Sequence, residues 1–353
     1  MPQTPIDTLI VGQGLAGSLL AWMLIRAGRQ VCVIDDGHKS SSSTVAAGLV
    51  NPLAGMRFNR RPEMDDWLMA SDACYDTLAA QFGRPFFHAL PMLRLFRSTD
   101  QIRFHTRRLD DPASRGLLEA AFKPADCPEP IATPYGGFIQ RRTGFVDMSQ
   151  LLACIRAWLR DNGALLELDL GHKQIEVTQD HVAAVGIKAQ GLVFCDGARL
   201  LSNPWFGKLP LAPDKGEILN LQVDGWRPRH IITGAHWILP LPNGELRLGA
   251  THEHHLLDNE PTRAGAQELL DGLDAMLRSS LESRVLQHRA GIRPATRDRY
   301  PLLGHHPEHP RLWVFNGFGA RGALTIPWYA GRFSAHLTRG MPLPPEADIR
   351  RFL

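Results

Sequence analysis

The sequence has few cysteines and no long apolar run. Its five cysteines are scattered along 353 residues, odd in number and without a CxxC pair. This pattern speaks against a disulfide framework and for a reducing compartment. No apolar run reaches 18 residues, so no membrane-spanning helix is expected. The apolar N-terminus lacks a basic leader and is broken by glycines, unlike a signal peptide. These absences predict a cytoplasmic protein.

The chain also carries little net charge. A formal charge of +3 is too small to imply a nucleic-acid partner. Three arginine pairs, at 60–61, 107–108 and 141–142, leave a local basic face open, with solvated surface as the alternative. Hydrophobic content of 44% and charged content of 21% are ordinary for a globular protein. The length suits one large or two medium domains.

A glycine-rich loop near the N-terminus is the strongest positive signal. Residues 12–17 (GQGLAG) follow a short apolar run at 8–11 and open a predicted helix over 15–28. A second apolar run at 31–34 ends at Asp35. The order strand, loop, helix, strand and acid is that of a dinucleotide-binding unit. The alternative is an ordinary strand-to-helix turn with chance glycines.

Each glycine of this loop has a separate physical task. Gly12 allows the tight turn, Gly14 lets the backbone approach a pyrophosphate, and Gly17 lets the helix pack on the strand. Asp35 would accept hydrogen bonds from the ribose and repel a 2′-phosphate, which disfavours NADP. The unit alone does not separate FAD from NAD. The small polar stretch 40–49 that follows would suit close approach to a ring system, or be a plain serine-rich loop.

A second glycine-rich loop, residues 317–322 (GFGARG), follows the apolar run 312–315. Only 31 residues come after it, with no further strand and no acid at the right place. A second nucleotide site, for NAD, is therefore the weaker alternative. A helix N-terminus and N–H donors pointed at a flavin would instead stabilise the negative charge of its reduced form.

Periodicity and turn signals predict the remaining elements. Helices are expected over 66–82, over 147–161 with Asp147 and Gln150 as a capping box and Gly163 as terminator, and over 264–286. Strands are expected over 93–97, 174–178, 181–188, 192–195 and 311–315, with antiparallel hairpins between 210 and 252 around the turn 242–244.

Seven segments together resemble the D-amino-acid-oxidase superfamily of FAD-dependent amine oxidoreductases, which includes glycine oxidase and monomeric sarcosine oxidase. They run in order along nearly the whole chain: 12–17 with Asp35, 43–48, 192–197, 213–217, 237–240 with 244–253, 291–298 with Pro301 and Gly304, and 317–327. Residues 319–322 with Pro327 also resemble the FAD domain of the bacterial bifunctional proteins that make 5-methylaminomethyl-2-thiouridine in tRNA. This chain has no room for their methyltransferase domain.

The resemblance implies an α/β (α+β overall) fold with a Rossmann-like FAD-binding domain interleaved with a mixed or antiparallel-sheet substrate domain. The FAD-binding domain is expected to take residues 1–85, 145–209 and 287–353, and the substrate or cap domain 86–144 and 210–286. Ala295 stands near the place where some members attach FAD through a cysteine, so noncovalent FAD is expected.

The resemblance also implies the functional residues. Arg293 would bind a substrate carboxylate, or else join the two domains; Arg321 would contact flavin or substrate, or lie on the surface. Arg247 falls where some members have a lysine proposed to activate oxygen, with an outward strand arginine as the alternative. His236 and Trp237 would partly replace the missing active-site tyrosines. The expected cofactor-binding residues are Gly12, Gly14, Leu15, Ala16, Gly17, Asp35, Asp36, Ser43, Ala47, Gly48, Leu49, Val177, Asp196, Gly197, Arg293, Gly317, Gly319, Ala320, Arg321, Gly322 and Ala323.

The implied reaction is hydride transfer from the carbon beside an amine to flavin, followed by hydrolysis of the imine. The substrate would be a small amino acid or secondary amine, and oxygen or a quinone the electron acceptor. Removal of a carboxymethyl group from a tRNA wobble uridine is the runner-up, and a flavin-binding protein without turnover the third hypothesis. The histidines at 252–255 and 305–309 match no familiar ligand spacing, so no metal is expected.

Overall fold

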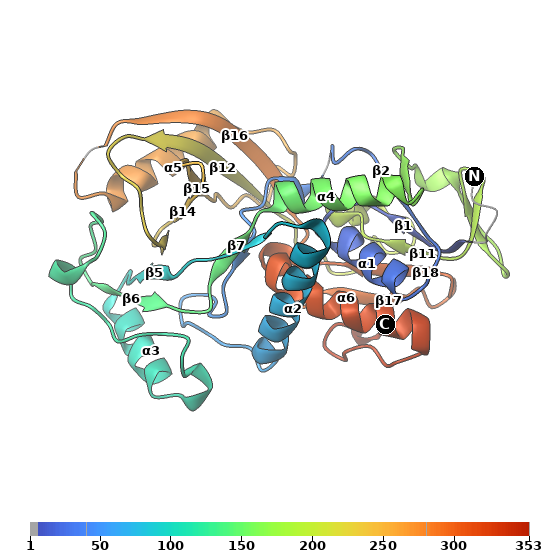
Figure 1. The fold of residues 1–353 in the computed structure, drawn as a ribbon, viewed down its shortest axis with the longest axis horizontal. Coiled ribbons are helices and arrows are strands. Elements are labelled where there is room, and N and C mark those ends of the chain that lie inside the picture. The colour runs from blue at the N-terminus through green and yellow to red at the C-terminus, as the bar shows by residue number, and fades with distance from the viewer. Residues whose placement is uncertain (1–5, 40, 280, 353) are drawn as a thin grey trace.

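The computed structural model describes residues 6–39, 41–279 and 281–352. An eight-stranded sheet and its helices form one end of the molecule, where both termini lie (Figure 1). The strand order is β17-β18-β11-β1-β2-β8, and β10 and β9 extend from β11. These strands are β1 Ile6–Val11, β2 Val31–Asp35, β8 Leu165–Glu167, β9 Ile175–Val177, β10 Val182–Ala184, β11 Ile187–Phe194, β17 Leu302–His305 and β18 Leu312–Asn316.

The centre of this sheet is parallel and buried. β1 pairs in parallel with β2 and β11, and β11 with β18, which requires helical crossovers. The helices α1 (Leu15–Arg26), α4 (Met148–Asp161) and α6 (Gly322–Arg339) cover one face, and α2 (Met64–Phe82) lies against α6. The strands therefore bury side chains on both faces and read as continuous apolar runs.

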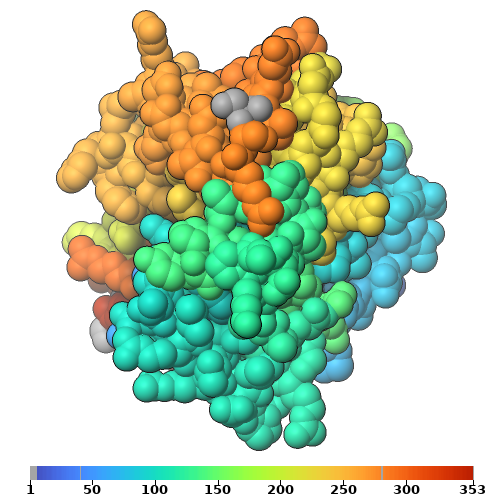
Figure 2. All heavy atoms as spheres, turned by 90° about the vertical axis from the view of Figure 1, so that its left-hand side faces the viewer, coloured from blue at the N-terminus to red at the C-terminus, as the bar shows by residue number. Residues whose placement is uncertain are grey.

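A seven-stranded sheet, order β16-β12-β15-β14-β13-β5-β6, forms the other end of the molecule. Its strands are β5 Met92–Leu95, β6 Gly137–Gln140, β12 Asp214–Val223, β13 Ile231–Thr233, β14 Trp237–Pro240, β15 Leu246–Gly249 and β16 Ser283–Arg293. Helix α5 (Arg263–Met276) packs on β12 and β15, and α3 (Thr99–Leu109) lies beside β5 and β6. Figure 2 shows this end, where the segment after α3 meets the end of α5 through the Ala132–Met276 backbone hydrogen bond.

A small sheet joins the two ends. It consists of β3 (Leu49–Val50), β7 (Gly144–Val146) and β4 (Phe87–Ala89). Two 3₁₀ turns border the space between the large sheets: η1 (Ser42–Thr44) and η6 (Gly319–Arg321). The predicted fold class, a Rossmann-like sheet combined with a mixed, largely antiparallel one, is confirmed.

Most predicted elements are present. The predicted N-cap opens α4, where the Asp147 carboxylate accepts from the Gln150 backbone N–H at 3.1 Å and from its side-chain amide at 2.6 Å. The reciprocal half of the predicted capping box is not formed, because the Asp147 backbone N–H donates to the Phe86 carbonyl oxygen at 2.8 Å. The continuous strand over 181–188 was wrong, because Val185 and Gly186, with φ of 46° and 80°, turn the chain between β10 and β11. A β-branched residue rarely takes positive φ, so this turn was hidden.

The predicted helix over 264–286 was also wrong in its second half. Helix α5 ends at Met276, and β16 begins at Ser283. β16 pairs with β12 along its length, a long-range contact that overrides local propensity. The proposed domain boundary at 286–287 falls inside β16; the domain limits stay a prediction. No helix within the described residues is both long and apolar enough to cross a membrane.

Candidate functional site

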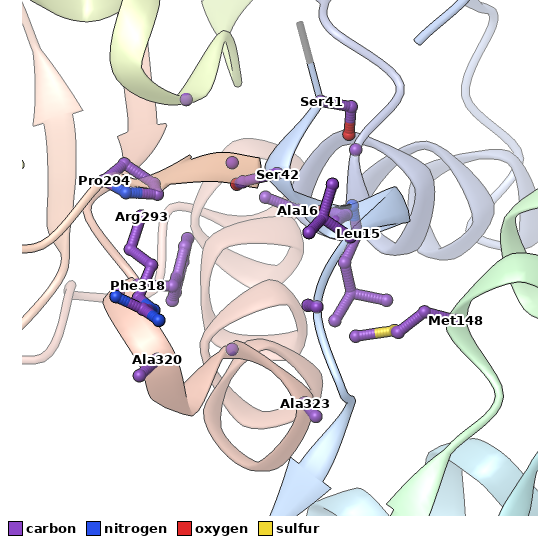
Figure 3. Close-up of a pocket in the computed structure, with 18 of the residues that line it drawn as sticks. Leu15, Ala16, Ser41, Ser42, Met148, Arg293, Pro294, Phe318, Ala320 and Ala323 are labelled. Atoms are coloured by element: carbon purple, nitrogen blue, oxygen red, sulfur yellow. Dashed lines mark hydrogen bonds between the residues drawn. The ribbon is translucent and has the colours of Figure 1, made fainter. Parts of the chain in front are cut away.

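A cavity of about 490 Å³ lies between the two large sheets. Segments of both sheets line it, among them the β1–α1 loop, the η1 region, the cavity-facing parts of β12, β14 and β16, and the η6 loop before α6. Figure 3 shows Leu15, Ala16 and Ser41 on one side, and Arg293, Phe318 and Ala320 on the other. The volume suits a sizeable organic ligand.

The β1–α1 loop leaves space for an anion. Gly12 has φ of 97°, and a Cβ on Gly17 would lie 1.9 Å from the Gly12 carbonyl oxygen, so both positions require glycine. The N-cap of α1 is Gly14, which offers no side-chain cap, and the first turn carries no acid. Ser43 Oγ accepts a hydrogen bond from the Leu15 backbone N–H at 3.0 Å. The N–H groups and the positive end of this helix start suit a pyrophosphate.

Asp35 lies at the end of β2, at the edge of the cavity. It accepts hydrogen bonds from the Gln13 backbone N–H at 2.8 Å, from His38 N–H at 3.0 Å and from Arg156 at 2.8 Å. Burial raises the pKa of Asp35, but these donors outweigh burial and hold it below its usual value. Asp35 is therefore an ionised acceptor fixed in place, and Arg156 is a partner that the sequence did not reveal.

Asp196, directly after β11, lines the same cavity and behaves in the opposite way. Asn316 donates to its carboxylate at 3.0 Å, but burial raises the pKa of Asp196 to about 7. Such a carboxyl group is about half protonated at pH 7. It therefore adds less negative charge next to an anionic ligand than an ordinary aspartate does.

Asp196 should make the stability of the ligand-free protein depend on pH. Between the unfolded pKa of about 3.9 and the folded value of about 7, the folded state binds more protons, so stability falls as pH rises. Asp196→Asn should stabilise the protein by up to about 4 kcal/mol at pH 8 and have little effect at pH 4. Urea unfolding at both pH values measures this, and an equal effect at both would contradict the assignment.

The η6 loop forms the other end of the cavity. Gly317 and Gly319 have φ of 82° and 52°, and a Cβ on Gly317 would approach the Thr296 methyl carbon to 2.8 Å. Arg321 is the N-cap of α6 without a side-chain cap, and the first turn of α6 has no acid. As at α1, backbone N–H groups at a helix start face the cavity region.

Arg293 reaches the cavity from the end of β16. Its guanidinium lies over Gly216 of β12, where an added Cβ would meet a guanidinium nitrogen at 1.9 Å. Its Nη1 donates to Asp214 Oδ2 at 2.7 Å, and Nη2 to the Thr251 carbonyl oxygen at 3.4 Å. Figure 3 shows the side chain beside Phe318. Asp214 and the Thr251 carbonyl thus fix the Arg293 guanidinium from one side.

Asp214 was missed in the sequence. It lies opposite Arg293 in the β12–β16 register, and its Oδ2 also contacts His252 Nδ1 at 2.7 Å. Burial raises the pKa of Asp214, but His252 and Arg293 bring it below the usual value. Its Oδ1 is buried without a hydrogen-bond partner among the described residues. Only the strand register would have revealed this pair.

The other predicted catalytic residues do not all line the cavity. Trp237 and His236 line the cavity. His236 Nδ1 is buried without a partner among the described residues, and burial lowers the pKa of this imidazole. Arg321 lines the cavity, whereas Arg247 does not; Arg247 Nε donates to Asn220 Oδ1 at 3.1 Å.

Most predicted cofactor-binding residues line the cavity: Gly12, Gly14, Leu15, Ala16, Asp35, Asp36, Ser43, Ala47, Gly48, Leu49, Asp196, Gly197, Arg293, Gly319, Ala320, Arg321, Gly322 and Ala323. Gly17, Gly317 and Val177 do not; the two glycines permit close packing, and Val177 lies on β9. Lining residues that the sequence did not suggest include Met148, Thr233 and Asn316. The binding roles of all these residues stay predictions.

His306, Glu308 and His309 lie outside the cavity, with one ligand atom of each within 4.8 Å of the others. However, His306 Nδ1 already accepts the Glu308 backbone N–H at 3.2 Å, so this nitrogen is engaged.

A dinucleotide-binding sheet whose cavity continues to a second sheet is the arrangement of an oxidoreductase that holds a dinucleotide cofactor next to its substrate. The chain belongs to the DAO family of FAD dependent oxidoreductases, whose profile matches residues 7–337. It is 25% identical to a glycine oxidase from Bacillus licheniformis, covering 96% of this chain and 95% of that protein. It is 28% identical to the tRNA 5-methylaminomethyl-2-thiouridine biosynthesis bifunctional protein MnmC from Methylibium petroleiphilum, covering 98% of this chain but 59% of that protein.

Among solved structures, the glycine oxidase from Geobacillus kaustophilus superposes with a TM-score of 0.81, at 21% identity and 95% coverage of both chains. The predictions of an FAD-dependent oxidoreductase of the amine and amino-acid oxidase type, and of FAD as cofactor, are confirmed. The noncovalent state stays a prediction. Cys195 is the cysteine among the lining residues, and burial raises its pKa well above the usual value, which makes it a poor nucleophile.

Proposed function

We propose that this protein oxidises the C–N bond of a small amino acid or secondary amine that carries a carboxylate. The bound FAD supplies the chemistry by accepting a hydride from the carbon beside the nitrogen, and the imine product hydrolyses in water. The observation that carries this proposal is Arg293, a largely buried guanidinium in the cavity wall. The similarity to glycine oxidases supports it.

One edge of the Arg293 guanidinium is available for a ligand. Nη1 donates to Asp214 Oδ2, and Nη2 donates weakly to the Thr251 carbonyl oxygen. No acceptor for Nε is found among the described residues. A carboxylate can accept two parallel hydrogen bonds from Nε and Nη2. In this proposal Asp214 is a positioning residue that fixes the guanidinium over Gly216, and Arg293 places the substrate carbon for reaction.

His236 and Trp237 would complete the substrate side of the cavity. The amine must be unprotonated when the C–H bond breaks, and a neutral imidazole can accept its proton. Burial keeps His236 in this neutral form, and its Nδ1 has no partner within the described residues. Trp237 gives an apolar wall that limits water.

Purified protein should be yellow, and its flavin should bleach when glycine or sarcosine is added without air. Absorbance near the flavin maximum follows the reduction, and peroxide release on admitting air would identify oxygen, rather than a quinone, as an acceptor. A flavin that chemical reductants bleach, but no amine or amino acid does, would refute the proposed activity. A flavin that stays coloured under either treatment would favour a non-catalytic role.

The similarity to MnmC supports a second candidate: oxidative removal of a carboxymethyl group from a modified tRNA uridine. That substrate group is also a secondary amine carrying a carboxylate, so the same cavity residues would serve. A tRNA complex should then weaken steeply as salt rises, because arginines release counterions from phosphates. The absence of any salt-sensitive complex would exclude this candidate. Cytoplasmic localisation is part of either proposal and rests on the unpaired cysteines.

A further inference from the structure

Arg321 is a second arginine in the cavity wall, on a different element from Arg293. Arg293 comes from β16, whereas Arg321 stands at the start of α6. Its guanidinium carbon lies 5.6 Å from the ring centre of Trp67, and Nη2 donates to the Arg299 carbonyl oxygen at 3.3 Å. These contacts hold the side chain in a defined position but leave most of its N–H groups available.

Two more arginines lie close to Arg321. Arg61 stacks over the Tyr300 ring at 4.5 Å and donates to the Tyr300 hydroxyl at 3.1 Å. Burial lowers the pKa of Arg321, and the charges of Arg61 and Arg299 lower it further. Arg321 is thus partly desolvated and lies within reach of the charges of Arg61 and Arg299, and Arg299 is itself exposed.

No carboxylate balances these three cations directly. Within the described residues, none of the three arginines forms an ion pair with an Asp or Glu. Glu63 is nearby, but its Oε1 accepts a hydrogen bond from the Tyr300 hydroxyl, at 3.4 Å, rather than from one of these arginines. The fully buried Trp67 indole N–H also has no acceptor among the described residues. Like charges kept together without a partner cost stability, and an anion would relieve that cost.

We propose that Arg321, backed by Arg61 and Arg299, is a second anion subsite of the substrate cavity. This inference rests on the proposed amine oxidation and sharpens its substrate class. With Arg293 for one carboxylate and Arg321 for another, the preferred substrate is a secondary amine flanked by two carboxylates, of which iminodiacetate is the smallest. The FAD pyrophosphate does not need this subsite, because its anion site lies at the start of α1.

Two substrates isolate this subsite. Sarcosine and iminodiacetate share the secondary amine and one carboxylate, and differ in the second carboxylate. Wild-type kcat/KM should be higher for iminodiacetate. Arg321→Gln should lower kcat/KM for iminodiacetate about 10- to 100-fold, because a pair of charged hydrogen bonds is lost. The same variant should lower kcat/KM for sarcosine less than about threefold. Arg61→Gln should show a weaker loss in the same direction, and Arg321→Lys should restore part of it.

Arg103→Gln is the matched control, since Arg103 lies on α3 with its side chain 72% exposed. This variant should leave kcat/KM unchanged for both substrates. FAD content and circular dichroism of every variant check that the fold is kept. Equal losses for both substrates in Arg321→Gln would overturn the inference and assign Arg321 to the flavin. A wild-type protein that prefers sarcosine would also overturn it.

A binding measurement separates this inference from the proposed reaction. Diglycolate and methoxyacetate replace the amine nitrogen by oxygen, so they keep the two-carboxylate and one-carboxylate shapes without an oxidisable amine. Diglycolate should perturb the flavin absorption at lower concentration than methoxyacetate, and Arg321→Gln should remove that difference. If no amine reduces the flavin but this difference is seen, the proposed activity fails and the anion subsite stands. If both ethers bind alike, the subsite fails.

Discussion

Arg293→Leu should lower kcat/KM for a small amino acid by about 10²- to 10³-fold while FAD stays bound. Two effects add to this loss: two charge-assisted hydrogen bonds to the carboxylate disappear, and the reacting C–H bond is no longer fixed in place. Because the β1–α1 loop is also proposed to hold FAD, through the pyrophosphate, the variant should remain yellow. The measurement is the rate of anaerobic flavin reduction at several substrate concentrations.

The same substitution should destabilise the protein, for a reason unrelated to the substrate. Arg293 and Asp214 form an ion pair with side chains only 17% and 12% exposed. Removing one partner of a buried pair costs about 3–5 kcal/mol, because the other charge stays behind. His252 still contacts Asp214, so the loss should lie at the lower end of this range.

The double variant Asp214→Asn with Arg293→Leu separates the two effects. It removes both charges, so it should regain much of the stability but none of the activity. Denaturant unfolding and flavin reduction are measured on the same preparations. If activity returned together with stability, Arg293 would be a structural residue joining the sheets, and its substrate role would be refuted.

Local patterns in the sequence were sufficient to predict the dinucleotide unit. The order of apolar run, glycine loop and acid is contained within thirty-odd residues, and so it survives without knowledge of the rest. The second loop was predicted as well, because Gly317–Gly322 repeats the strand-to-helix pattern. By contrast, the Asp214–Arg293 pair depends on the register between β12 and β16, which are far apart in the chain.

Contacts between distant segments also explain why the other predictions were wrong or incomplete. β16 contains polar, helix-compatible residues, and only its pairing with β12 fixes it as a strand. The arginines at 60–61 were noticed as a charge pattern, but the proximity of Arg61 to Arg321 depends on α2 packing against α6. Arg247 was chosen from a linear match alone. Its side chain contacts Asn220 rather than the cavity, so its proposed role with oxygen stays a prediction.

Gly17→Ala should yield protein that is purified largely without FAD. The added Cβ would lie 1.9 Å from the Gly12 carbonyl oxygen and 3.3 Å from Cys195 Cβ, so α1 must move away from β1. Overpacking of this kind costs about 1–3 kcal/mol of stability. Displacing the start of α1 also moves the N–H groups that would bind the pyrophosphate, so FAD affinity should fall roughly 100-fold, as expected for a shift near 1 Å.

Gly331→Ala is the matched control, because it makes the same change inside another helix. Gly331 lies in α6, where an added Cβ meets nothing within 4 Å. Replacing a helix glycine by alanine in open space should raise stability by up to about 1 kcal/mol and leave FAD bound. The ratio of flavin to protein absorbance, FAD titration of the apoprotein and the Tm distinguish the two variants. If both kept wild-type FAD affinity, the start of α1 would not be the pyrophosphate site, because the contact that fixes its position would have been lost without consequence.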